Sequence, residues 1–208
     1  MKSLTHYIQE KLIIKKSTTQ KNKSTNYKYF PKSKYELKNI ILKRIKDEGN
    51  EVDLNDIDVS NIKDMSGLFD NLEDFNGNIS RWDVSNVTDM RYMFCNCKSF
   101  NKDISAWNVS NVTDMYGMFS ACEAFNQDIS VWDVSKVKNM GEMFSYCQLF
   151  NQNISAWDVS NVINMEAMFY RCTNFNQDIS SWDVSNVKYM DYMFNYCKIE
   201  EKYKPNFR

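Results

Sequence analysis

The spacing of the tryptophans is the feature that most restricts how this chain can fold. The five tryptophans, Trp82, Trp107, Trp132, Trp157 and Trp182, follow one another at intervals of 25 residues. The sequence around each one repeats in the same register, as in FNQDISSWDVSNVKYMDYMF. A fixed period of about 20–50 residues is typical of stacked repeat proteins, in which one unit alone cannot bury its apolar side chains. The chain is therefore expected to form a stack of similar coils.

The apolar positions inside one unit predict its local structure. Met90, Met93, Phe94 and Cys97 have the spacing of one face of a two-turn helix, which Asp89 could cap. The segment 100–109 is rich in β-branched and aromatic residues, so it predicts a short strand and a turn. Each Trp lies between an Ile and a Val that recur in every copy, which favours a place in the core over a binding strip. The predicted fold is an α/β solenoid of about six 25-residue coils.

A capped helix is expected before the repeats. Pro31 precedes it, Ser33 and Glu36 match a capping box, and Gly49 stands where a left-handed C-cap is usual. A second, amphipathic helix is expected over 3–16, followed by a polar linker over 15–29. The predicted organisation is 1–30 as a basic N-terminal helix and flexible linker, 31–50 as a capping helix, 51–199 as the repeats and 200–208 as a C-terminal tail.

Charge divides the chain in two. Residues 1–50 hold 13 Lys and Arg against 4 Asp and Glu, whereas residues 51–208 hold 13 against 23. The basic segment is either an interaction arm or a segment that lies against the acidic repeats. A nucleic-acid partner would use the basic residues 11–46, with aromatic side chains such as Tyr27 and Phe30 to stack on bases. No apolar run is long enough for a membrane span, and the first residues do not read as a signal peptide.

The cysteines are expected to be reduced and buried. Five of the six recur at one repeat position, and Leu72 fills that position in the first unit. These five are Cys97, Cys122, Cys147, Cys172 and Cys197; Cys95 lies outside the series. A position that accepts either Cys or Leu requires a small apolar filler, so we expect neither disulfides nor metal binding there.

The repeated motif has the consensus F-N-Q-D-I-S-x-W-D-V-S-N-V-T-D-M-x-x-M-F-x-x-C. It resembles the BspA-like surface-protein repeats of mycoplasmas, gut bacteria and their phages. Those repeats are similar in turn to the Treponema-type leucine-rich repeats. The resemblance implies a right-handed, leucine-rich-repeat-like stack with a short strand and a short helical turn in each coil. It also implies a surface, adhesion or protein-interaction module rather than an enzyme, located on a cell surface or a virion.

The first ten residues, MKSLTHYIQE, carry a second resemblance. They are similar to the leaders of internal head proteins in some large tailed phages, which a protease cuts after an Ile-x-Glu triplet, here Ile8-Gln9-Glu10. This resemblance implies an alternative function, a phage structural or capsid-packaged protein with an N-terminal targeting leader. A small docking helix is the simpler interpretation of the same residues.

The residue types that usually carry catalysis are sparse in the repeats. The single histidine is His6, outside the repeats, so no catalytic residue, cofactor or metal site is predicted. Rows of Asp and Asn recur, as at Asp58, Asp83, Asn108, Asp133, Asp158 and Asp183. Calcium binding by such rows is conceivable, but the exchange of Asp for Asn favours side chains that cap backbone turns. The row of Asn76 and its equivalents is expected to hydrogen-bond the backbone from coil to coil.

Specific recognition should use the positions that differ between copies. Three variable columns begin at residues 91, 92 and 96 and supply residue types that are enriched in binding hot spots. The candidate protein-binding residues are Arg91, Tyr92, Tyr116, Tyr146, Arg171, Tyr192 and Tyr196. The alternative is a solvated surface on which the copies have drifted apart. The sequence thus predicts a non-enzymatic module that binds a protein partner.

Overall fold

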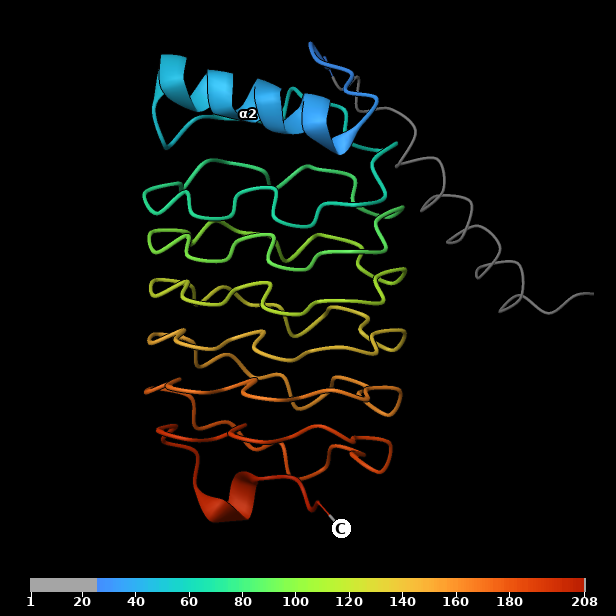
Figure 1. The fold of residues 1–208 in the computed structure, drawn as a ribbon, viewed down its shortest axis with the longest axis vertical. Helices are drawn as coiled ribbons and strands as arrows, with labels where there is room; N and C mark the ends of the chain where they lie inside the picture. The colour runs from blue at the N-terminus through green and yellow to red at the C-terminus, as the bar shows by residue number, and fades with distance from the viewer. Residues whose placement is uncertain (1–25, 208) are drawn as a thin grey trace, which may run out of the picture.

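The computed structural model describes residues 26–207, and Figure 1 shows them as a column of coils with one helix across its first end. Parallel β-bridges join residues that are 25 positions apart in the sequence. One series of five bridges links Asp64, Asp89, Asp114, Asn139, Asn164 and Tyr189. Because these six residues are bridged in one line, six coils are stacked in register. One 25-residue repeat therefore forms one coil.

Backbone hydrogen bonds between coils run along the segment that begins at residue 90. The N–H groups of Met90, Tyr92, Phe94 and Asn96 donate to the carbonyl oxygens of Asp114, Tyr116, Met118 and Ser120, at 2.7–2.9 Å. The same pattern of four donors recurs in each of the first five coils. Every second residue of this segment therefore bonds the next coil, as in a parallel β-ladder.

The prediction of a two-turn helix over Met90–Cys97 is wrong. Tyr92 and Asn96 have φ values of 55° and 58°, which lie in the left-handed region and interrupt a right-handed helix. The N–H of Met93 donates to the carbonyl of Met90, and that of Cys97 donates to Phe94, as in two consecutive turns with a left-handed third residue. Two turns four residues apart place apolar side chains inward at the same spacing as a helix does.

Of the short strand and turn predicted over 100–109, the turn is present and the strand is absent from the described structure. The N–H of Trp107 closes a turn onto the carbonyl of Ile104 at 3.1 Å, and the segment has no β-ladder of its own. It is tied to the neighbouring coil through a side chain instead, because the N–H of Asn101 donates to Oδ1 of Asn76 at 3.0 Å. Each coil thus consists of turns and extended pieces, without a regular helix or strand.

Helix α2, Lys34–Glu48, covers the first coil as expected (Figure 1). Ser33 accepts a hydrogen bond from the N–H of Glu36, and Gly49, at φ 90°, donates to Ile45. Leu37 and Ile41 are fully buried against the first coil. These contacts confirm the predicted caps at both ends of the helix and its role as a cover.

The segment before α2 differs from the expected linker, which was to continue to residue 29. Tyr29 forms a parallel bridge with Ile57, and the N–H of Lys28 donates to Asp56 at 2.8 Å. The Lys28 and Arg44 side chains both pair with the Asp56 carboxylate. This part of the basic segment therefore lies against the acidic repeats. That agrees with the second of the two interpretations of the charge pattern, in which the segment packs on the repeats instead of forming an interaction arm.

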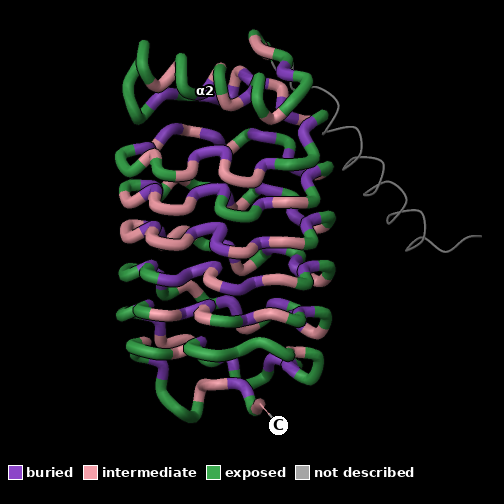
Figure 2. The backbone as a smooth tube through the Cα atoms, viewed as in Figure 1, coloured by how far each residue is buried: buried purple, intermediate pink, exposed green. Residues whose placement is uncertain are grey.

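The tryptophans and phenylalanines form the core between coils. All five tryptophans are at most 5 % exposed. Each indole N–H donates to a backbone carbonyl of the preceding coil, at 2.9–3.2 Å, for example from Trp107 to Ile79. Phe94 stacks on Phe119 with ring centroids 5.6 Å apart, and the stack continues along the column. Figure 2 shows buried residues recurring at equivalent places in successive coils. The tryptophans are core residues, as predicted.

The C-terminal residues fold back over the last coil. A short 3-10 helix, η1, Glu201–Tyr203, follows the last coil, and the carbonyl of Tyr203 accepts from the N–H of Ile179 at 3.0 Å. Pro205 is buried and Phe207 is partly buried against the core. The tail is therefore packed against the column.

We expect Ala167→Gly to stabilise the protein by about 0.5–1 kcal/mol, because the left-handed region costs an L-residue about 1–2 kcal/mol and glycine avoids most of that cost. Ala167 has a φ of 51°. Urea denaturation measures the effect. Ala124 is the matched control, since it is similarly buried but is not among the residues with positive φ. Ala124→Gly should destabilise by about 0.5–1 kcal/mol, and equal effects at the two sites would contradict the assignment.

Candidate functional site

The seven candidate residues all lie on one surface of the column, which we call the turn face. It consists of the side chains at positions 91, 92, 95 and 96 and their equivalents in the other coils, all of them in the segment that pairs coil with coil. Tyr92 and Tyr146 are 40 % and 42 % exposed, and Tyr192 and Tyr196 are 63 % and 69 % exposed. Large aromatic side chains are therefore accessible along this face in several coils.

A first cluster on the turn face joins Tyr92, Tyr116 and Glu142. The two tyrosine rings meet edge to face, with centroids 5.2 Å apart. The Tyr116 hydroxyl donates to the Glu142 carboxylate. Burial, followed by this carboxylate, raises the pKa of Tyr116, so its hydroxyl stays protonated and keeps donating at neutral pH.

Two glycines make room for these rings. A Cβ atom at Gly117 would lie 2.7 Å from the Tyr92 ring, and one at Gly141 would lie 2.9 Å from the Tyr116 ring. Both distances are too short for carbon atoms in contact. The absence of side chains at these two positions therefore lets each tyrosine ring pack against the backbone of the next coil.

A second cluster surrounds Arg171. Its guanidinium carbon lies 4.9 Å from the ring centroid of Tyr196, 5.5 Å from that of Tyr146 and 5.6 Å from that of Tyr170. The Tyr170 ring also meets Tyr146 and Tyr196 edge to face, at 5.4 and 5.7 Å. Stacking over aromatic faces is favourable for a guanidinium, so the four side chains hold one another in place on an exposed surface.

The remaining two candidates stand apart from these clusters. Arg91 pairs with Asp89 at 2.6 Å and approaches Asp114 at 3.8 Å. Among residues 26–207, Tyr192 has no aromatic or cationic side chain stacked against its ring. Sequence reasoning missed Tyr170 and Glu142. Glu142 belongs to the variable column that begins at residue 92. Tyr170 belongs to a fourth variable column, at 95, 120, 145, 170 and 195 (Cys, Ser, Ser, Tyr, Asn).

The backbone beneath the turn face is strained where its large residues occur. Tyr92, Tyr146, Arg171, Tyr192 and Tyr196 all have φ values between 55° and 60°. The equivalent positions in other coils include Gly67, Gly117, Asn71 and Asn96, which are residue types that tolerate this region. Bulky side chains thus occupy positions where folding alone would favour Gly or Asn.

The Asp and Asn rows cap turns, as expected. In the row that begins at Asp58, each Oδ1 atom accepts from the N–H two residues later, at 3.0–3.1 Å. The row that begins at Asn76 accepts from the backbone of the next coil. Within residues 26–207, no group of three His, Cys, Asp or Glu side chains is arranged to hold a metal ion.

We expect Asp133→Asn to leave the fold intact and to reduce the loss of stability in acid. Hydrogen bonds from the Ser135 hydroxyl and N–H lower the pKa of Asp133. A carboxyl whose pKa is lower in the folded state stabilises the protein above its unfolded pKa, and this contribution disappears as the pH falls below about 4. Melting temperatures between pH 7 and pH 3 measure the effect. Asn108 already occupies the equivalent position, so Asn108→Asp should have the opposite effect.

The cysteines are thiols in the described structure. Cys97, Cys122, Cys147 and Cys172 are fully buried, and each Sγ donates to a carbonyl of the preceding coil at 2.8–3.1 Å. Burial raises the pKa of all four, which keeps them protonated. Cys95 is half-buried, and burial raises its pKa to about 11. The four buried thiols act as core filler, as predicted, whereas Cys197, the fifth member of the series, is only partly buried.

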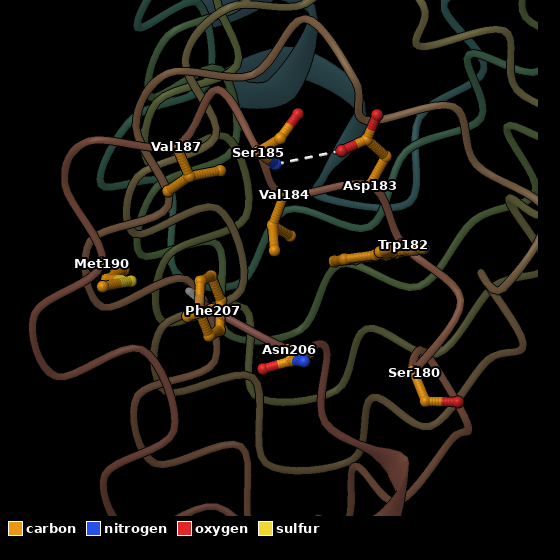
Figure 3. A pocket seen from close by; sticks show the side chains of 9 residues that line it. All are labelled: Ser180, Trp182, Asp183, Val184, Ser185, Val187, Met190, Asn206 and Phe207. Atoms are coloured by element: carbon orange, nitrogen blue, oxygen red, sulfur yellow. Dashed lines mark hydrogen bonds between the residues drawn. The ribbon is translucent and has the colours of Figure 1, made fainter.

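A hollow of about 500 Å³ lies between the last coil and the C-terminal tail. Figure 3 shows Asn206 and Phe207 of the tail opposite Trp182, Val184 and Met190. Asp183 is the ionisable residue among its lining, and its Oδ1 already accepts from the N–H of Ser185 at 3.0 Å. No second acid or base stands beside this carboxylate in the lining.

Several predictions lie outside the described residues. His6, the helix over 3–16, most of the linker and the leader with its Ile8-Gln9-Glu10 triplet all fall in residues 1–25. Of the nucleic-acid candidates, Tyr29 packs beside the Arg44 guanidinium at 5.4 Å, whereas Phe30 is exposed. Among the described helices, none has the length and apolar character that a membrane crossing requires.

Comparison with known proteins gives one result. No curated protein and no solved structure is similar enough to this chain to count as a match. The model of one family, described as "Mycoplasma protein of unknown function, DUF285", matches residues 39–147 and again residues 127–204. The two matches together extend from within α2 to the 3-10 helix and include the whole column of coils. The chain therefore belongs to the DUF285 family.

Proposed function

We propose that this protein is a non-enzymatic interaction module of the adhesion type, which binds a protein partner through its turn face. The observation that carries the proposal is the placing of exposed Tyr and Arg side chains at left-handed backbone positions. Each such residue costs about 1–2 kcal/mol relative to a residue that tolerates the region. Residues that lower stability and remain exposed are better explained by binding than by folding.

The chemistry of the turn face suits a protein partner. Tyr and Arg are the residue types that most often carry binding energy at protein interfaces. In the second cluster, Arg171 is held between Tyr146, Tyr170 and Tyr196, so little side-chain freedom remains to be lost on binding. The cluster therefore provides a preformed aromatic and cationic surface in three neighbouring coils.

The likeness of the repeated sequence to BspA-like repeats supports this proposal. Within the DUF285 family, we place the chain with the BspA-like type and describe its column as a right-handed, leucine-rich-repeat-like solenoid. The alternative function, a phage structural or packaged protein with a cleaved leader, depends on residues 1–10. Intact-mass analysis of native material tests it, because packaging requires loss of the residues before Lys11.

We expect the double variant Tyr146→Ala/Tyr196→Ala to lose at least about 30-fold in affinity for the partner, since a hot-spot side chain contributes about 2 kcal/mol or more. The full chain and the variant would be used to capture proteins from an extract of the source cells. The affinity of the protein captured by the full chain is then measured for both. Val131→Ala is the control, because Val131 is 74 % exposed and lies outside the turn face.

Two outcomes would contradict the proposal. The first is a partner that binds the double variant and the Val131→Ala variant with equal affinity while both proteins remain folded. The second is binding that high salt alone abolishes, because screening acts on exposed charges and would assign the contact to the basic residues 11–46. Thermal unfolding followed by circular dichroism shows whether the variants keep their fold.

A further inference from the structure

The last coil ends in a row of backbone donors without acceptors. In each earlier coil, four alternate N–H groups donate to the next coil. In the last coil, the equivalent N–H groups belong to Met190, Tyr192, Phe194 and Tyr196, and none of them donates to an acceptor within residues 26–207. The last coil therefore presents the same alternate N–H groups that join the earlier coils, but here these groups have no partner among the described residues.

The carbonyl groups of the same segment are almost all occupied. The carbonyls of Tyr189, Asp191, Met193 and Asn195 accept from the preceding coil. Those of Met190, Tyr192 and Phe194 accept within the turns of their own coil. An ordinary β-edge offers donors and acceptors in alternation, but this edge offers donors almost alone.

The apolar side chains of this edge are exposed as well. Met190 is 42 % exposed, whereas its five equivalents, Met65, Met90, Met115, Met140 and Met165, are fully buried. Tyr189 is 58 % exposed, and Val187 and Phe194 are partly buried. The tail covers only part of the edge, since the hollow of Figure 3 remains open between Phe207 and Met190.

The opposite end of the column has the complementary pattern and is covered. In the first coil, the equivalent carbonyls of Asp64, Ser66, Leu68 and Asp70 accept no backbone hydrogen bond from the described chain, and α2 lies across this end of the column (Figure 1). Lys38 Nζ donates to the carbonyl of Gly67 at 2.9 Å, and Lys34 Nζ donates to Asp64 and Ser66. A helix thus covers the acceptor end. At the donor end the tail packs beside Phe194, with Lys204 Nζ 5.5 Å from its ring centroid, but it supplies no acceptor to the four N–H groups within residues 26–207.

A second copy of the column does not fit the donor edge. Two copies placed tail to tail would bring donor rows together, which leaves every N–H unpaired at a cost of about 1–3 kcal/mol for each buried group. Two copies placed head to tail would require α2 to leave the first coil, with exposure of Leu37 and Ile41. The occupant must therefore be a segment with free carbonyl groups at alternate residues.

We propose that the edge Tyr189–Tyr196 is a second docking site, which binds an extended, apolar peptide segment of a partner protein by backbone pairing. The segment supplies carbonyl oxygens to Met190, Tyr192, Phe194 and Tyr196 and covers Met190 and Phe194 with its own apolar side chains. The site extends the ladder of the column by one strand. It shares Tyr196 with the cluster around Arg171, but it uses the backbone N–H of that residue and not its ring.

The test uses a peptide that copies the natural occupant of an inner donor row. Residues 112–121, VTDMYGMFSA, hold the four carbonyls that pair with Met90, Tyr92, Phe94 and Asn96 in the column. This segment, acetylated and amidated, is titrated into the full chain, and amide exchange is followed by NMR. At a peptide concentration about tenfold above its Kd, exchange at the four edge amides should slow about tenfold. The amide of Asp191 should change much less, since it lies between paired positions.

Substitutions at the edge provide the second measurement. Met190→Lys or Tyr189→Lys should weaken peptide binding at least about tenfold, because a charge replaces an apolar contact at the docking site. Val131→Lys is the control for an added charge on exposed surface. A peptide of the same composition in scrambled order controls for non-specific contact.

Three results would overturn the proposal. One is slowing that is absent or spread evenly over Asp191 and its neighbours. Another is peptide affinity that is the same in Met190→Lys and Val131→Lys. The last is sedimentation of the peptide-free chain as a dimer with the same four amides protected, which would assign the edge to self-association. Tyr146→Ala, whose turn-face residue lies two coils before the edge, leaves this readout unchanged, so failure of the proposed function and failure of the second site are distinguishable.

Discussion

Trp132→Ala is expected to lower the free energy of unfolding by about 3–5 kcal/mol, because it removes the largest side chain of a middle coil and leaves a cavity. Trp132 is 4 % exposed. Its ring is stacked on Trp107 with centroids 6.5 Å apart, and its indole N–H donates to the carbonyl of Ile104 at 3.2 Å. The substitution therefore loses packing between coils and one of the two hydrogen bonds that the Ile104 carbonyl accepts, the other coming from the N–H of Trp107 at 3.1 Å.

Urea denaturation measures this effect, and Trp132→Phe separates its two parts. Phenylalanine keeps an aromatic ring in the coil but cannot donate to Ile104, whose carbonyl still accepts from Trp107, so we expect a loss of about 0.5–1.5 kcal/mol for the missing hydrogen bond. Ile57 fills the equivalent position of the first coil, where no earlier coil supplies the same carbonyl. A loss below about 1 kcal/mol for Trp132→Ala would be typical of a surface residue and would contradict the burial of the tryptophans.

The features that depend on the period could be predicted from the sequence. A residue type that recurs at every 25th position meets its own copies in the neighbouring coils, so the burial of Trp132 and the Asn76 ladder followed from the repeat itself. The caps of α2 at Ser33 and Gly49 were also predictable, because they depend on local hydrogen bonds. These features could be predicted because they depend only on neighbouring residues or on the equivalent residues of adjacent repeats.

The conformation inside each coil could not be predicted in the same way. Met90, Met93, Phe94 and Cys97 have helical spacing, but their segment gives alternate N–H groups to the next coil instead of to its own preceding turn. Pairing with another coil thus overrode the local periodicity. Gly67, Gly117 and Asn71 were the available signal against a helix, because Gly destabilises the interior of a helix but is well tolerated at a left-handed position.

The candidate site was predicted in outline only. Variation between copies selected residues that the column brings onto one face, because side chains that do not pack in the core are free to differ. It could not reveal that Arg171 lies among three tyrosines or that Tyr116 donates to Glu142, since those contacts join residues from different coils. The donor edge at Met190 was missed for a similar reason, because it depends on which backbone groups the coils leave unpaired.

Cys122→Asp is expected to destabilise the protein by about 3–5 kcal/mol at pH 7, the cost of a buried charge without a partner. Cys122 is fully buried, and its Sγ donates to the carbonyl of Phe94 at 2.8 Å. A carboxylate at this place would lie beside a carbonyl oxygen, in a site where burial already raises the pKa of the native thiol. Urea denaturation at several pH values measures the effect.

The pH dependence distinguishes a buried charge from a simple packing defect. Burial raises the pKa of the new carboxyl above its unfolded value of about 4, so the folded state keeps the proton while the unfolded state loses it. The destabilisation should therefore be smallest near pH 4 and should grow as the pH rises toward 7. A packing defect would give the same loss at every pH.

Two further variants complete the argument for the thiol row. Cys122→Val keeps an apolar side chain and should cost less than about 1.5 kcal/mol, in agreement with Leu72 at the equivalent position of the first coil. Val131→Asp places the same charge on an exposed position of the following coil and should change stability by no more than about 0.5 kcal/mol. If Cys122→Asp were as mild as Val131→Asp, the thiol row would be accessible to water, and the cysteines would be open to oxidation and metals after all.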